Sequence, residues 1–177
     1  MPTICIFVAS SSSCPQKYRD WAENIAANLA DQGWDLVFGG SHVGLMALVA
    51  ETFKTRGRRV TSVIPEEFAT RCPAFPDSDE VIRTPGLRVR KEEMAKRADA
   101  FLALTGGCGT LDEFNEILTL KHLDMAPQPL VLFNPESYWQ PYLDMLSRFD
   151  EERFAAHPPL DMFRIATTVD AVTDCLS

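Results

Sequence analysis

Residues 100–114 read Ala-Phe-Leu-Ala-Leu-Thr-Gly-Gly-Cys-Gly-Thr-Leu-Asp-Glu-Phe, and this stretch decides the fold. The apolar run at 100–104 is typical of a short strand that is buried on both faces of a parallel sheet. Two glycines stop the strand, and 109–123 then carries a helical pattern. A strand, a glycine turn and a helix in this order predict one unit of an α/β sheet.

The same alternation extends through the chain. Apolar runs predict further strands at 4–8, 36–38, 60–64, 80–83, 130–133 and 163–166. Helical periodicity predicts further helices at 15–31, 44–56, 87–98, 136–149 and 169–176, and 66–79 is predicted to be a loop. Continuous apolar strands that alternate with helices favour a Rossmann-like, doubly wound parallel sheet with helices on both faces. The length of 177 residues suits a single domain over 1–177.

Composition excludes several classes of function. The chain has 17 basic and 25 acidic residues, and this formal net charge of −8 argues against nucleic acid or an anionic membrane as a partner. No apolar run approaches a membrane span, and the first residues do not resemble a signal peptide. Five scattered cysteines and three isolated histidines predict neither disulfides nor a metal site. We therefore expect a cytoplasmic protein with no metal and no cofactor.

Small residues follow three of the predicted strands. Ala9-Ser10-Ser11-Ser12-Ser13 follows the first strand, Gly39 and Gly40 follow the second, and Thr105-Gly106-Gly107-Cys108-Gly109-Thr110 follows the strand at 100–104. Backbone N–H groups in such turns, with a helix N-terminus behind them, bind anions. One turn alone is equally well explained by tight chain reversal, and the serines at 10–13 could instead cap the first helix. The absence of G-x-x-x-x-G-K-[ST] and of G-x-G-x-x-G argues against ATP hydrolysis and hydride transfer.

The segment 83–97 is strongly basic, with six basic residues against two acidic ones. On a helical wheel Leu87, Met94 and Ala98 form an apolar stripe, and Arg90 and Lys91 border it. Cations at such positions need an anionic ligand, carboxylate partners or access to water. The sequence leaves these three possibilities open.

Glu113 also has two interpretations. Thr110-x-x-Glu113 fits a capping box, in which Thr110 is the N-cap residue and Glu113 bonds back to it. Alternatively, Glu113 lies at the mouth of the anion-binding turn. A carboxylate there is suited to stabilise a positive charge that develops in a transition state, or to activate water.

These motifs carry a family resemblance. The segments 39–46, 90–94 and 106–113 resemble the Lonely Guy (LOG) family, which has also been labelled as lysine decarboxylases. The chain departs from the family pattern at Thr105, where the family has Pro, and at Ala47, where Gly is common. The resemblance implies a catalytic pair, Arg90 and Glu113. It also implies contacts to a nucleotide from Lys91, Gly106, Gly107, Cys108, Gly109, Thr110, Leu111, Asp112 and Thr119.

The resemblance implies hydrolysis of the N-glycosidic bond of a nucleoside 5′-monophosphate. The expected substrate is AMP or an N6-substituted AMP of the cytokinin type. It also implies a homodimer with the active site near the subunit interface. The alternative is a carrier of a nucleotide or of the molybdenum cofactor that has no hydrolytic role. A pyridoxal-phosphate-dependent decarboxylase fits only the older label, because no lysine stands in a recognisable Schiff-base setting.

Overall fold

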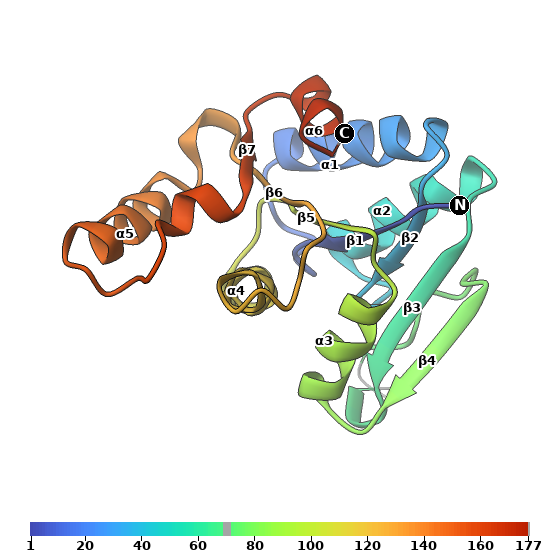
Figure 1. Ribbon diagram of the computed structural model, residues 1–177. Helices are drawn as coiled ribbons and strands as arrows, with labels where there is room; N and C mark the ends of the chain where they lie inside the picture. Colours follow the sequence, from blue (N-terminus) through green and yellow to red (C-terminus); the bar gives the residue numbers. More distant parts are fainter. Residues whose placement is uncertain (69–71, 177) are drawn as a thin grey trace.

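The computed structural model describes residues 1–68 and 72–176, which form a seven-stranded sheet with six α-helices (Figure 1). The strands are β1 (Thr3–Phe7), β2 (Asp35–Phe38), β3 (Val60–Pro65), β4 (Glu80–Thr84), β5 (Ala100–Ala103), β6 (Leu130–Phe133) and β7 (Arg164–Ala166). The helices are α1 (Gln16–Asp31), α2 (Gly44–Thr55), α3 (Leu87–Lys96), α4 (Cys108–His122), α5 (Gln140–Glu151) and α6 (Val169–Leu176). Three short 3₁₀ turns are η1 (Glu66–Phe68), η2 (Pro135–Ser137) and η3 (Pro159–Met162).

All six pairs of neighbouring strands are parallel, in the order β4-β3-β2-β1-β5-β6-β7. The chain winds outward from β1 in one direction and then resumes from β5 in the other. This reversal creates a crevice between the carboxyl ends of β1 and β5, the place where open α/β sheets bind ligands. The predicted doubly wound fold is confirmed.

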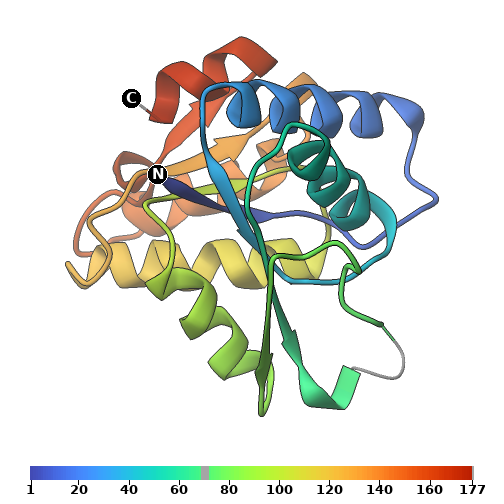
Figure 2. The ribbon, with the colours of Figure 1, turned by 90° about the vertical axis from the view of Figure 1, so that its right-hand side faces the viewer.

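Helices cover both faces of the sheet (Figure 2). Ile4 and Ile6 of β1 belong to a core cluster shared with α1, α2 and α6, whereas Cys5 and Phe7 belong to a second cluster shared with α3, α4 and α5. Successive side chains of a strand point to opposite faces, so a strand buried on both sides needs a continuous apolar run. The run at 4–8 meets this requirement.

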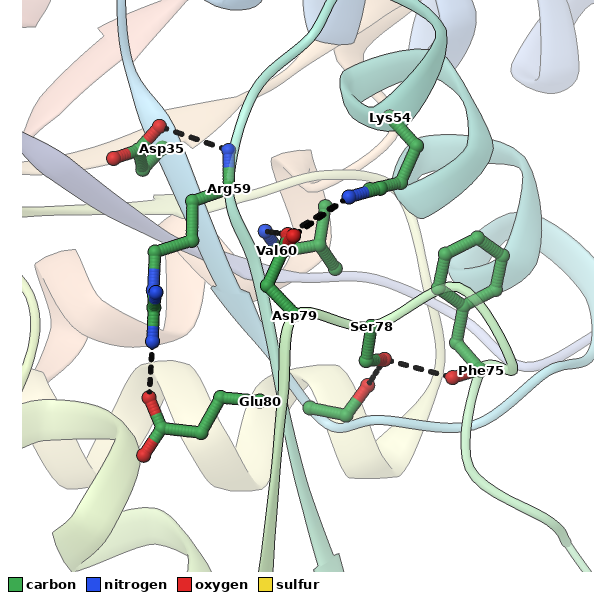
Figure 3. Close-up of polar contacts among 9 residues, drawn as sticks. Asp35, Lys54, Arg59, Val60, Phe75, Ser78, Asp79 and Glu80 are labelled. Atoms are coloured by element: carbon green, nitrogen blue, oxygen red, sulfur yellow. Dashed lines mark hydrogen bonds and ion pairs between the residues drawn. The ribbon is translucent and has the colours of Figure 1, made fainter.

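The edge strand β4 is fixed to its neighbours by polar contacts at its start (Figure 3). The Asp79 carboxylate accepts hydrogen bonds from Lys54 Nζ at 2.8 and 2.9 Å and from the Val60 N–H at 2.7 Å. One residue further, Glu80 forms an ion pair with Arg59, with 2.9 Å between Oε2 and Nη2. These contacts join α2, β3 and β4 and set the register of the edge strand.

The helix predicted from Glu136 is wrong at its start. Glu136 and Ser137 have φ values of 50° and 58°, which is the left-handed region, so the chain makes one 3₁₀ turn and α5 begins only at Gln140. Pro141 suits the first turn of a helix, where its missing N–H has no intrahelical partner. It is the sequence signal for the later start.

The prediction of an apolar stripe on α3 is wrong at Leu87. Met94 and Ala98 are buried, but the Leu87 side chain is 46% exposed and lines a cavity. The predicted loop at 66–79 begins with the η1 turn, and its residues 69–71 lie outside the described residues. Within the described ranges, every helix falls short of the length and apolar character needed to span a membrane.

Candidate active site

The N-terminus of α4 presents free backbone N–H groups at the sheet edge. Gly107 is the N-cap residue, with extended backbone, and the first helical hydrogen bond runs from the Leu111 N–H to the Gly107 carbonyl at 3.0 Å. The N–H groups of the four preceding residues therefore have no acceptor within the helix. Together with the helix dipole, these donors favour an anion at this end.

The capping-box interpretation of Thr110 and Glu113 is wrong. Gly107 caps the helix without a side chain, and Thr110 is already inside it. Gly106 allows this early start, since a Cβ atom there would collide with the Thr110 hydroxyl. Glu113 does not bond back to the helix start but forms an ion pair with Arg90.

Arg90 of α3 and Glu113 of α4 form a largely buried pair. Arg90 Nη2 contacts Glu113 Oε1, and the two side chains are 14% and 4% exposed. The guanidinium also lies against Gly39, where a Cβ atom would be only 3.2 Å from Nη1. Gly39 therefore makes room for Arg90. Of the three possibilities for Arg90, namely an anionic ligand, a carboxylate partner or access to water, the structure shows the carboxylate partner.

The buried environment shifts the ionisation of Glu113. Burial raises the pKa of its carboxyl from its ordinary value to about 7, although the positive charge of Arg90 and the hydrogen bond from it oppose the rise. Asp112 raises this pKa further, and Lys91 lowers it. A carboxyl group that changes its charge near neutral pH is suited to general acid–base work.

Arg90 and Glu113 open into a cavity of about 440 Å³. Of the site residues predicted from the sequence, those that line this cavity are Ser10, Arg90, Gly107, Gly109, Thr110, Asp112 and Glu113. Its apolar wall includes Val8, Met46, Phe68 and Leu87, which we did not predict as site residues. Met46 lies within the family motif at 39–46, and this position was the available signal. The cavity thus combines anion donors, a buried carboxylate and an apolar wall.

The other predicted site residues lie elsewhere. Lys91 Nζ forms ion pairs with Asp112 at 2.9 Å and with Glu116 at 2.5 Å. Burial alone would lower the pKa of Lys91, but the two carboxylates outweigh burial, and the pKa is raised. Gly40 has a φ of 78° and packs tightly against the backbone of β3. Leu111 packs against the core, and Cys108 is exposed.

Two further cavities flank this region. Gly106 lines a cavity of about 340 Å³ between the loop after β1 and the turn after β5. Thr119 lines a larger apolar groove of about 620 Å³ between α4 and α5, and its hydroxyl donates to the Asn115 carbonyl at 2.8 Å. In the described part of the chain, no group of three or more His, Cys, Asp or Glu is placed to hold a metal ion.

A family model described as "Possible lysine decarboxylase" matches residues 46–176. The cytokinin riboside 5′-monophosphate phosphoribohydrolase LOG of Oryza sativa subsp. japonica is 37% identical over 153 residues, which cover 86% of this chain and 63% of the rice protein. The chain belongs to the LOG family. The probable phosphoribohydrolase LOGL3 of the same species is 36% identical over 172 residues, which cover 97% of this LOG-family chain and 82% of LOGL3.

The fold of this LOG-family chain also occurs in more distant proteins. The molybdenum cofactor carrier protein of Chlamydomonas reinhardtii superposes with a TM-score of 0.73 over 99% of this chain and 98% of its own, at 20% identity. At this identity the likeness concerns the fold alone. Within the chain, the three LOG-like motifs meet around one cavity, since Met46, Arg90 and Glu113 all line it.

Proposed function

We propose that this chain hydrolyses the N-glycosidic bond of a nucleoside 5′-monophosphate, either AMP or an N6-substituted AMP of the cytokinin type, to free base and ribose 5-phosphate. One observation carries the proposal: the buried Arg90–Glu113 pair lines the same cavity as Gly107, Gly109 and Thr110 at the start of α4. The names of the curated LOG relatives support the reaction type.

The phosphate binds at the start of α4. The N–H groups of Gly107 to Thr110 donate to its oxygens, and the helix dipole adds to the attraction. The phosphate does not react, so its binding energy serves to orient the ribose next to Glu113. The nucleotide is thereby held with its glycosidic bond beside the carboxylate.

Glu113 acts on the sugar. As the bond between C1′ and the base nitrogen breaks, the ribose gains oxocarbenium character, which an ionised carboxylate stabilises. Water supplies the oxygen that bonds to C1′. Glu113 takes one proton from this water and then releases it to solvent, while the departing base nitrogen keeps the bonding electron pair and gains a proton from solvent, so one water molecule is consumed. Arg90 orients Glu113 and keeps part of it ionised at neutral pH, because its charge lowers the pKa of the carboxyl.

The apolar wall of the cavity suits the base. Val8, Met46, Phe68 and Leu87 line it, and an adenine ring or an apolar N6 substituent would bury surface against them. A hydrophobic wall discriminates weakly between substituents of different size. We therefore propose the adenine nucleotide class rather than a single member of it.

The test is a panel of nucleoside monophosphates assayed for free base by chromatography. We expect release of adenine or N6-substituted adenine, and Glu113→Gln should lower turnover by at least about 100-fold while nucleotide binding persists. Glu92→Gln, which alters an exposed carboxylate on α3, is the matched control and should retain full turnover. Nucleotide binding without any base release would contradict the proposal and favour a carrier.

We further propose that the chain forms a homodimer through the face around the groove of α4 and α5. Three exposed apolar side chains line it, namely Leu123, Phe149 and Phe154. Contiguous apolar surface of this kind marks interaction sites. Thr119 lies in the same groove, so a contact between Thr119 and a nucleotide would cross to the site of the second copy. Sedimentation of the wild type and of Phe149→Asp tests this, with a dimer expected only for the wild type.

A further inference from the structure

A tyrosine from a distant part of the sequence contacts the anion-binding turn. Tyr138 follows the η2 turn after β6, and its hydroxyl donates a hydrogen bond to the Gly106 carbonyl oxygen at 2.7 Å. The Gly106 carbonyl belongs to the peptide unit that also contains the Gly107 N–H. This N–H is the first of the four donors that the proposed phosphate site uses.

The geometry of a peptide unit couples the two groups. In a planar trans peptide, the C=O and N–H bonds point in opposite directions. Gly106 and Tyr138 line the cavity of about 340 Å³ on one side of the turn, while Gly107 lines both this cavity and the one that contains Glu113. A carbonyl held toward Tyr138 therefore directs the Gly107 N–H toward the Glu113 cavity.

The turn itself has little that would hold this orientation. Rotation of the peptide unit changes ψ of Gly106 and φ of Gly107, and glycine permits most values of both. A rotated unit would present the carbonyl oxygen to the phosphate in place of a donor. Two like partial charges would then face each other, and the site would lose one hydrogen bond. An external hydrogen bond is what selects the productive orientation.

Aromatic contacts hold one side of the Tyr138 ring, which is 40% exposed. The ring packs edge-on against Tyr18 of α1, with 5.5 Å between ring centroids, and against Trp139 at 4.8 Å. The turn before it holds two non-glycine residues in the left-handed region, Glu136 and Ser137, and Glu136 forms an ion pair with Lys17. Left-handed non-glycine residues are strained and persist where surrounding contacts enforce them, often at functional sites.

We propose that Tyr138 is a positioning residue for phosphate recognition: through the Gly106 carbonyl it orients the Gly107 N–H toward the phosphate. This inference rests on the proposed function, because it assigns a role within the same site. Tyr138 touches no reacting atom, so its effect falls on the phosphorylated ligand and not on the base.

The experiment measures the affinities for AMP and for adenosine, which lacks the phosphate. Both are measured in the Glu113→Gln background so that AMP is not consumed. Adding Tyr138→Phe removes the hydroxyl and keeps the packed ring; we expect about 5- to 20-fold weaker AMP binding and unchanged adenosine binding. The matched control is Tyr142→Phe, which removes a hydroxyl that donates to Asn115 Oδ1 at 2.7 Å. It should change neither affinity by more than about twofold.

A second readout is the Gly107 amide resonance in ¹⁵N spectra during titration with inorganic phosphate. We expect the Gly107 resonance to shift in the parent protein, which carries Glu113→Gln alone, and to shift much less when Tyr138→Phe is added. An AMP-to-adenosine affinity ratio that survives Tyr138→Phe overturns the role of Tyr138 and leaves the proposed function standing. A parent protein that binds AMP no better than adenosine overturns the phosphate site itself, and both proposals fail.

Discussion

Replacing Glu113 with Gln should remove a pH dependence of stability that is unusual for a carboxyl group. Burial raises the pKa of Glu113 from 4.5 to about 7, so between these values the folded protein holds a proton that the unfolded chain has lost. Stability falls with rising pH wherever the folded state binds more protons. The contribution of Glu113 is therefore greatest below about pH 4.5 and is lost as the pH rises to about 7.

The size of the effect follows from this interval. Each pH unit within it changes the free energy of unfolding by about 1.4 kcal/mol, so the whole interval amounts to about 3 kcal/mol. Gln has the shape of the protonated Glu and still accepts a hydrogen bond from Arg90, but it does not titrate. The variant should match the wild type near pH 4.5 and exceed its stability by about 3 kcal/mol at pH 8.

Urea unfolding of wild type and Glu113→Gln at pH 5, 6, 7 and 8 measures this difference. Glu92→Gln serves as the control for loss of one negative charge, since Glu92 lies on the exposed side of α3 and pairs with Lys96 at 2.8 Å. The free energy of unfolding of Glu92→Gln should depend on pH in the same way as that of the wild type. Parallel curves for wild type and Glu113→Gln would refute the claim that the folded protein raises the pKa of Glu113.

Three further predictions concern the neighbours of this carboxyl and the sheet edge. Arg90→Met removes the charge that lowers the pKa of Glu113. Base release needs the ionised carboxylate and should rise with pH around this pKa, so in the variant the rise should move above pH 7. Rates of base release from pH 5.5 to 9 measure the shift, and a profile equal to that of the wild type contradicts it. Gly39→Ala places a Cβ atom 3.2 Å from Arg90 Nη1 and should lower turnover about tenfold. Gly86→Ala, where a Cβ atom meets nothing within 4 Å, should not lower it. Asp79→Ala removes the acceptor for Lys54 and Val60 and should cost about 1–2 kcal/mol in urea unfolding with turnover retained. Unchanged stability would show that these bonds do not hold β4.

Hydrophobic patterns sufficed for most of the fold because strands buried on both faces leave little ambiguity. The strand at 130–133 and the helix at 169–176 have the predicted bounds. The start of α5 was missed because left-handed backbone at Glu136 and Ser137 has no signature in the residue types. Only the proline at 141 marked the true start.

The candidate site was less predictable, because it depends on contacts between elements. The spacing of Thr110 and Glu113 fits a capping box, and only the position of Arg90 on a neighbouring helix shows that Glu113 has another partner. Leu87 has the periodicity of a core residue but lines the cavity. The contact of Tyr138 with Gly106 joins residues 32 positions apart, and no local pattern could indicate it.

Arg90 lies on the most weakly anchored of the longer elements around the cavity. In α3, Met94 is the buried residue, whereas α4 buries several side chains, including Phe114 and Ile117. Segments with little buried apolar area open locally at a lower free energy than the whole domain unfolds. On warming, α3 should detach first and carry Arg90 away from Glu113, so enzymatic inactivation should precede the loss of circular dichroism from the sheet. Hydrogen exchange would then be faster at the amides of α3 than at those of α4.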